Sequence, residues 1–322
     1  MPSKRLIWII VSGMAISFLS GAQLTAYSDT DLQQLVQENE QEKRLAAYKD
    51  NTTTLKLKLE VLDVINKNRT RHGLKPVKLD IFACRVASMT ASEAANGKYH
   101  GHWNLRGEKP YHRYAFAGGV HHVSENASSV WGSIPEKSYQ SVLKYCIERH
   151  MAMYNERPPY DGHRKNILNS WHTHVGLGFS MTGGHFRYYE EFVDKYLEFD
   201  PVNTKVNAGD QVTLSGKVTV PDYGLFFLTV YYENFPRPMT PAELSSKGAY
   251  PDYTGNRVVS KAFWDLNYDD STKRFTVSFK TSQPGLYYVH LYVKKGHTGK
   301  ESPGSVTTRG LSPVSGIVIR AE

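Results

Sequence analysis

The spacing of the apolar residues changes near Asp200-Pro201, and this change constrains the fold more than any other feature of the chain. Before this point, apolar side chains such as Leu55 and Leu59 recur at the three-to-four-residue interval of a helix that buries one face. After it, β-branched and aromatic residues alternate with polar ones, which is the repeat of a strand. The chain has 322 residues, enough for two cores. We therefore expect an α+β domain over residues 55–198 and an all-β domain over residues 199–322.

Helical repeats and their end signals predict the elements of the α+β domain. Thr52-Thr53-Thr54 offers an N-cap for the first helix, and Gly73 ends it. Asp80 offers the N-cap of the second helix, which Gly97 ends. The Gly183-Gly184 pair predicts the turn of a hairpin. The expected elements are helices near 31–40, 55–73, 80–97 and 137–154, strands at 173–181 and 186–192, and a loop from 98 to about 136.

Short alternating segments at regular spacing predict a β-sandwich for the second domain, with an immunoglobulin-like build. The paired cysteines of an antibody domain do not occur in this part of the sequence. Residues 236–256 form a long polar insertion. The expected strands are 212–218, 225–232, 274–279, 287–293 and 317–320.

The first residues have the pattern of an export signal. Lys4-Arg5 precedes an apolar run, Leu6–Leu19, and the small residues Ser20-Gly21-Ala22 offer a cleavage site. The run is shorter than the ~20 apolar residues of a membrane span. We therefore expect a signal peptide over residues 1–22, with an uncleaved signal anchor as the alternative and as the one route to a membrane. A polar spacer over residues 23–54 follows, and the protein is expected to be secreted, extracellular or periplasmic.

Charge and cysteine content exclude some partners and leave one question open. The net charge of +8 is dispersed, without a dense Lys/Arg block or a nucleic-acid motif. We expect no nucleic-acid partner, and only weak attraction to an anionic cell surface. The two cysteines are Cys84 and Cys146. An exported chain permits a disulfide between them, but two buried, unpaired thiols on helices are the alternative.

Two histidine-bearing loops, far apart in the sequence, are candidates for one shared pocket. His102 lies in the first loop, His163 lies in the second, and Glu125 lies between them. Imidazole and carboxylate groups bind Zn²⁺, and the same groups act as general acids and bases. No His-Glu-x-x-His helix is present, so the ligands would come from separate loops. The alternative is coincidence among 13 histidines, with loop side chains that share no role.

Four stretches of this region resemble the CAP superfamily, which is named for cysteine-rich secretory proteins, antigen 5 and pathogenesis-related-one proteins. The likeness covers residues 55 to about 196, is closest to the bacterial branch, and says nothing about the second domain. The stretches are Val64-Ile65-Asn66-Lys67-Asn68-Arg69 with Gly73-Leu74-Lys75-Pro76 and Leu79-Asp80, Gly101-His102-Trp103-Asn104 with Gly107, Pro110, Tyr111 and Arg113, Ser124-Glu125-Asn126-Ala127, and Gly162-His163-Arg164-Lys165-Asn166-Ile167-Leu168-Asn169 with Val175-Gly176-Leu177-Gly178.

The resemblance implies an α-β-α sandwich with a cleft of two histidines and two glutamates, and divalent-metal binding. His102 and His163 match the two histidines, and they are the implied ligands of a Zn²⁺ ion. Glu125 matches the glutamate of the Gly-Glu-Asn motif, although serine replaces the glycine here. The second glutamate is either Glu148, at the usual interval before the second histidine, or Glu156.

The other histidines are expected to be exposed or structural. His100 lies two residues from His102, so on an extended loop both face the same way. It could substitute as a ligand, although a surface position is the simpler interpretation. His121-His122 are expected on an exposed loop. His172 and His174 share one strand face and are expected to pack.

Three functions follow from these observations. The first is a secreted or cell-surface CAP-domain protein whose cleft binds zinc and an extracellular glycan, lipid or protein. The second is an extracellular hydrolase acting on peptide bonds, in which His163 or Glu125 activates water. The third is an adhesion or scaffold module without catalysis. Whether the chain is an enzyme stays open at this point.

Overall fold

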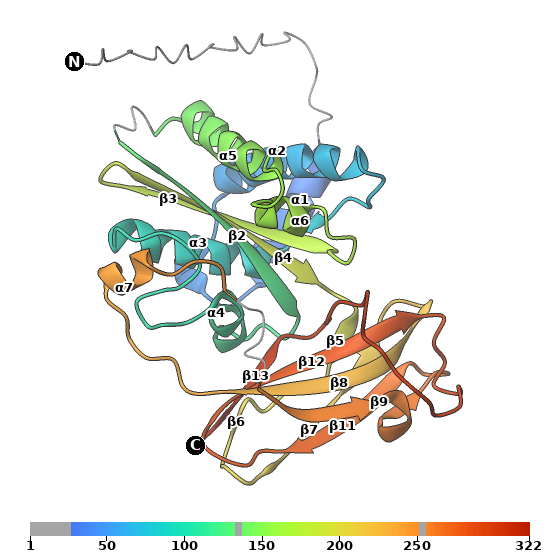
Figure 1. The fold of residues 1–322 in the computed structure, drawn as a ribbon. Coiled ribbons are helices and arrows are strands. Elements are labelled where there is room, and N and C mark those ends of the chain that lie inside the picture. The colour runs from blue at the N-terminus through green and yellow to red at the C-terminus, as the bar shows by residue number, and fades with distance from the viewer. Residues whose placement is uncertain (1–26, 133–136, 251–255) are drawn as a thin grey trace, which may run out of the picture.

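The computed structural model in Figure 1 describes residues 27–132, 137–250 and 256–322. The expected signal peptide lies outside these residues. Helices enclose one sheet in the first half of the chain, and two further sheets form the second half. The mixed helix and sheet content predicted for the first half is confirmed. Among the described helices, none combines the length and the apolar character needed to span a bilayer.

The sheet of the first half has the strand order β1-β3-β4-β2. Strands β3 (His174–Thr182) and β4 (His185–Asp194) form the predicted hairpin, and Gly183 and Gly184 both adopt positive φ in its turn. The short β1 (Lys78–Leu79) pairs in parallel with β3, and β2 (His122–Trp131) pairs antiparallel with β4. Strand β2 therefore forms one outer edge of the sheet.

The Val175-Gly176-Leu177-Gly178 motif allows a helix to approach this sheet closely. A Cβ atom on Gly176 would lie 2.2 Å from the Ala83 carbonyl carbon, and one on Gly178 would lie 2.1 Å from that of Ala87. Both alanines belong to α3, which packs on β3 and β4. The two glycines are needed because any side chain there would collide with the helix backbone. Figure 1 shows α2 and α5 across the opposite face.

The predicted helices are present, with one corrected cap. Asp80 caps α3 as expected, and its Oδ1 accepts from the Ala83 N–H at 2.9 Å. The cap of α2 is Asn51 rather than the threonine run, because its Oδ1 accepts from the Thr54 N–H at 2.8 Å and Thr52 already begins the helix. The helical segments of this half are α1 (Asp29–Gln41), η1 (Ala46–Tyr48), α2 (Thr52–Thr70), α3 (Ile81–Asn96), α4 (Pro110–Phe116), α5 (Tyr139–Tyr154) and α6 (Gly162–Ile167).

One further expectation is corrected. The stretch predicted as a loop up to residue 136 contains α4 and the ten-residue strand β2. The predicted polar spacer contains α1 and packs against the first half, because Leu35 is buried and Arg85 Nη2 donates to the Asn39 carbonyl at 2.7 Å. Both cysteines are buried and free, so no disulfide forms between Cys84 and Cys146.

The second half contains two sheets over a shared core. Their strand orders are β10-β11-β7-β5 and β6-β13-β12-β8-β9. Leu214 and Val277 from the first sheet pack in one cluster with Val230 and Val289 from the second. All five predicted strands are present, whereas the immunoglobulin-like topology stays a prediction. The elements are β5 (Leu197–Phe199), β6 (Lys205–Val206), β7 (Gln211–Val218), β8 (Tyr223–Glu233), α7 (Pro241–Ser245), β9 (Arg257–Ala262), η2 (Phe263–Asp265), β10 (Asn267–Asp269), β11 (Arg274–Lys280), β12 (Gly285–Lys295) and β13 (Ile317–Ala321).

A buried polar cluster joins the two halves. Glu233, at the end of β8, accepts from Lys109 Nζ at 2.9 Å and from the Tyr111 hydroxyl, and His112 Nε2 lies 3.3 Å from its carboxylate. Burial alone raises the pKa of Glu233, but these partners lower it to about 2. The Tyr111 ring also stacks on Tyr288, with ring centroids 4.2 Å apart. The second half is thus packed firmly beside the elements that carry the candidate site.

Candidate functional site

A cavity of about 1150 Å³ lies along the outer edge of β2. Residues 124–129 of this strand form one wall. The loop at residues 100–102 and the start of α6 form further walls, and they carry the two predicted histidines. Residues 247–250 of the second half also line it. The cavity therefore brings together the separate loops named from the sequence, and it adds a segment from the polar insertion.

His102 is held by a buried carboxylate on β2. Its Nδ1 lies 2.8 Å from Glu125 Oε1, and the other carboxylate oxygen accepts from Arg113 Nη2. Arg113 Nη1 also donates to the His102 carbonyl at 2.7 Å, so one guanidinium fixes both members of the pair. Burial raises the pKa of Glu125, and Arg113 acts in the opposite direction. The ion pair thereby keeps a carboxylate available to the Nδ1 of His102.

A second buried carboxyl group, which the sequence analysis did not identify, lies beside Glu125. Glu191 on β4 is directly opposite Glu125 in the strand register, and neither side chain is exposed. Burial raises the pKa of Glu191 well above its usual range, and the charge of Glu125 adds to the effect. Glu191 is therefore the member of the pair that keeps its proton. The sequence signal was an acidic pair, Glu190-Glu191, inside an otherwise apolar strand.

His163 forms the corresponding pair on the other side of the cleft. Its Nδ1 lies 2.6 Å from Glu156 Oε1, and its backbone N–H donates to the other oxygen at 3.1 Å. The His163 side chain is 30% exposed, so the ring is accessible from the cavity. Asn126 on β2 donates to the His163 carbonyl at 3.3 Å and ties α6 to the strand. The ring centroids of His102 and His163 lie 6.1 Å apart.

The structure brings Glu156, and not Glu148, to the histidines. Glu148 lies on the solvent side of α5, and its carboxylate is 3.9 Å from Lys144. It does not line the cavity. Glu156 lies just beyond the end of α5, where the chain turns back toward α6, and this turn aims its side chain at His163.

Tyr250 is a site residue that the sequence analysis missed entirely. Its hydroxyl accepts from the Glu125 N–H at 2.9 Å, and its ring centroid is 4.9 Å from that of His102. The residue belongs to the insertion between β8 and β9, which was expected to be a polar loop of the second half. Only the tertiary packing of the two halves shows that this insertion reaches the cleft, and no local sequence pattern signals it.

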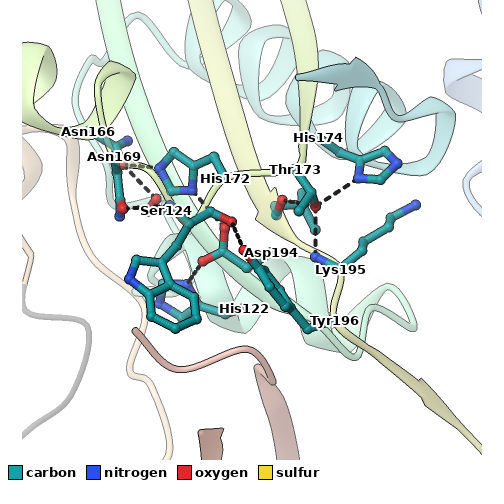
Figure 2. A network of polar contacts seen from close by, with 12 residues as sticks. His122, Ser124, Asn166, Asn169, His172, Thr173, His174, Asp194, Lys195 and Tyr196 are labelled. Atoms are coloured by element: carbon teal, nitrogen blue, oxygen red, sulfur yellow. Dashed lines mark hydrogen bonds and ion pairs between the residues drawn. The ribbon is translucent and has the colours of Figure 1, made fainter. Parts of the chain in front are cut away.

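Figure 2 shows a polar network that continues from the cavity wall into the protein. Asp194 lies between His172 Nδ1, at 2.7 Å, and His122 Nδ1, at 3.0 Å. Burial alone raises the pKa of Asp194, but the two imidazoles together lower it to about 2. His172 Nε2 is 2.9 Å from Asn166 Oδ1, which also accepts from the Ser124 hydroxyl at 2.7 Å. This network fixes the β2 and α6 walls relative to β4.

The remaining histidines differ partly from expectation. His172 is buried and stacks on Phe192, so its packing role is confirmed. His122 is also buried, which corrects the expectation of an exposed loop, because it begins β2 and contacts Asp194. His100 lines the cavity beside His102. Burial lowers the pKa of His121 and of His174 to about 4.

The residues of the cavity could hold a metal ion only through two protein ligands, the imidazoles of His102 and His163, with the other coordination positions left open. Each ring has its Nδ1 against a carboxylate, which is how metal-binding histidines are usually oriented. Nε2 is then the nitrogen through which each ring would bind a cation. However, the part of the chain that the structure describes has no group of three or more His, Cys, Asp or Glu side chains placed to hold a metal. A closed structural site is therefore not formed, and further ligands would come from solvent or from a bound molecule.

Neither cysteine offers a nucleophile to this site. Both thiols are fully buried. Burial raises the pKa of Cys84 to about 12, and it raises that of Cys146 as well. Since the thiolate is the reactive form, both side chains are structural.

The first half of the chain is similar to known proteins. Residues 62–193 match the cysteine-rich secretory protein family, CAP. The protein YkwD of Bacillus subtilis (strain 168) is 27% identical over 143 residues, which cover 42% of this chain and 50% of that protein. The chain thus spans about half the length of the curated relative that it matches.

Two solved structures are also similar over part of the chain. An extracellular protein containing a SCP domain from Bacillus anthracis is 22% identical, with a TM-score of 0.33, over 42% of this chain and 40% of that one. An outer surface protein of Borrelia burgdorferi is 16% identical, with a TM-score of 0.33, over 43% of this chain and 92% of that one.

Proposed function

Residues 62–193 form a domain of the CAP family, and from this premise we propose that the chain is an extracellular protein whose cleft binds a divalent cation, zinc foremost, together with an extracellular ligand. His102 and His163 would hold the cation. The extracellular location rests on the leader pattern, in which Lys4-Arg5 precedes the apolar run Leu6–Leu19.

The observation that carries this proposal is the pairing of each imidazole with a carboxylate. Glu125 and Glu156 accept at Nδ1, so they fix the tautomer and leave Nε2 of each ring free to bind a metal. Both pairs line the same cavity, with ring centroids 6.1 Å apart. Two imidazoles that bind the same Zn²⁺ ion, each at ~2.1 Å, have ring centroids roughly 5–6 Å apart. The two histidine side chains would therefore need to move little to share one ion.

The surrounding residues keep the two rings in place. Arg113 orders the His102 loop through its carbonyl, and Asn126 orders α6 through the His163 carbonyl. The Tyr250 ring packs against the His102 ring, with centroids 4.9 Å apart. A bound zinc ion would supply a Lewis-acidic centre for an oxygen atom of the ligand. The open coordination positions make the cleft suited to binding a ligand.

A hydrolase is the second candidate, and the exposed His163–Glu156 pair is the observation that favours it. A partly exposed imidazole whose Nδ1 is held by a carboxylate has the arrangement of a general base. Water would then be the nucleophile, because both cysteine thiols are buried. Peptide hydrolysis assays with and without zinc separate this candidate from binding alone.

A zinc titration by calorimetry tests the main proposal. The metal-stripped protein should bind one zinc ion with micromolar or tighter affinity, and the His102→Ala/His163→Ala variant should lose this binding. His100→Ala is the matched control, because His100 lines the same cavity without a carboxylate partner at Nδ1 among the described contacts. Equal binding in all three proteins, or none in the parent, would contradict a shared metal site.

A further inference from the structure

We infer that the ligand of this cleft is an extended acidic peptide, which binds by adding to the outer edge of β2 as a further strand. This inference rests on the proposed function, since it specifies the extracellular ligand of the same cleft.

The outer side of β2 carries unused main-chain groups. The Glu125 N–H donates to the Tyr250 hydroxyl at 2.9 Å, so it points away from the partner strand β4. Main-chain groups alternate between the two sides of a strand. The N–H and C=O groups of Ala127 and Ser129 therefore also point outward. Within the described residues, no hydrogen bond is made to these groups from the outer side, and both residues line the cavity.

The same edge already accepts main-chain partners just before the cavity. His121 pairs antiparallel with Ser315 of the second half, and the Gly316 N–H donates to the Val120 carbonyl at 3.0 Å. The pairing stops there, where the cavity begins. Natural edge strands are usually protected by proline, by lysine or by a covering element. The sequence of β2 contains neither proline nor lysine, so inside the cavity the edge stays open to an added strand.

The charges of the cavity select the chemistry of the peptide. Its two glutamates are already paired, as described above. Arg187 and Lys247 line the cavity, and neither has a carboxylate partner in the part of the chain described. Arg187 is fully buried, and its Nε and Nη1 donate to the carbonyls of Tyr99 and Phe186 at 2.6 and 3.1 Å. Its Nη2 has no hydrogen-bond partner among the described residues. A buried guanidinium with one free donor and no carboxylate favours an anionic group nearby, and Arg187 lies directly opposite Ser129 in the register.

A peptide fits these observations better than an anionic polysaccharide. Donors and acceptors that recur every second residue, at a spacing of about 6.6–6.8 Å, match the main chain of an extended peptide. An anionic sugar chain has no such repeating main-chain donors and acceptors, although its carboxylates could pair with Arg187 and Lys247. The small side chains of Ala127, Ser128 and Ser129 also leave the edge accessible to a second backbone.

A peptide library retained on the immobilised full-length protein tests this inference. The probe is a mixture of ten-residue peptides with glutamate at alternate positions and random uncharged residues between them, detected by mass spectrometry. We expect selective retention. Two comparison libraries, one with N-methylated main-chain amides at alternate positions and one with lysine in place of glutamate, should not be retained.

Variants locate the contact without disturbing the sheet. Ser129→Pro removes one outward N–H but no bond to β4, since the residue's main-chain groups face the cavity. It should weaken retention about tenfold relative to Ser129→Ala, which keeps the N–H. Lys247→Glu should weaken binding of the glutamate library and permit that of the lysine library.

The outcomes separate this inference from the proposed function. Equal retention of the N-methylated library, or no retention of any library, would overturn strand addition. So would retention of polygalacturonate that Ser129→Pro leaves unchanged, because the anion would then bind without the edge. Zinc titration of the parent protein is the reference. If the parent binds zinc normally but retains no peptide library, only the peptide inference fails.

Discussion

Replacing Arg113 with methionine should lower the free energy of unfolding by about 3–5 kcal/mol, which is the usual effect of leaving a buried charge without its partner. Arg113 is buried at 2% exposure and donates to Glu125, which is itself buried. Methionine has a similar length and keeps most of the packing, so the loss comes mainly from the stranded carboxylate. Urea unfolding of the parent and the variant at pH 7 measures this difference.

The stability loss caused by Arg113→Met should depend on pH, because it arises from the charge of Glu125. Burial raises the pKa of Glu125, and Arg113 is the largest influence that lowers it. Without Arg113, the folded-state pKa should rise further above the ~4.3 of an unfolded glutamate. A carboxyl group with a raised folded pKa destabilises the protein above that pKa, and the penalty disappears as it is protonated. The defect of Arg113→Met should therefore be smaller at pH 5 than at pH 7.

A double-mutant cycle with Glu125→Gln checks the cause. If the ion pair is responsible, adding Glu125→Gln to Arg113→Met should restore part of the stability, because no buried charge remains. A single-variant loss below about 1 kcal/mol, as for an exposed pair, would refute this reasoning. Strictly additive effects of the two substitutions would refute it as well.

Two further predictions concern the carboxylates around the cleft. The pKa of Asp194 is about 2 in the folded protein, against ~3.9 in an unfolded chain. Ionised Asp194 therefore adds about 2–3 kcal/mol to the free energy of unfolding above pH ~4, and this contribution is lost as the pH falls through 2. Asp194→Asn should therefore be less stable at pH 6 and show a flatter loss of stability between pH 4 and pH 2 in urea unfolding, and an unchanged slope would contradict the role of its two histidines. Glu156→Gln should weaken zinc binding about 10–100-fold in calorimetry, whereas Glu148→Gln should leave it unchanged, and equal effects would count against the observed pairing of His163.

The sequence predicted the helices and the hairpin because their signals are local. Asp80 and Gly97 bound α3, and Gly183-Gly184 makes the hairpin turn. Strand β2 was missed because it is an edge strand with the largely polar sequence HVSENASSVW, so it lacks the apolar alternation of a half-buried strand. Helix α4 was missed because seven residues are too few for a helical repeat to show.

The candidate site was only partly predictable for a different reason. His102, Glu125 and His163 belong to sequence motifs, and the fold does bring them to one cavity. Glu191 and Tyr250 reach the site through strand register and through packing of the second half, which no local pattern encodes. The choice between the two candidate glutamates depended on where α5 ends, and element boundaries are the least certain part of sequence-based assignment.

The most direct test of the account is a crystal structure of the zinc-soaked protein with anomalous diffraction measured on both sides of the zinc edge. The account predicts one strong anomalous peak between His102 and His163, within about 2.0–2.1 Å of a ring nitrogen of each, with Glu125 and Glu156 still at Nδ1. A peak bound to only one of these histidines, or zinc found only at other surface positions, would contradict the shared site.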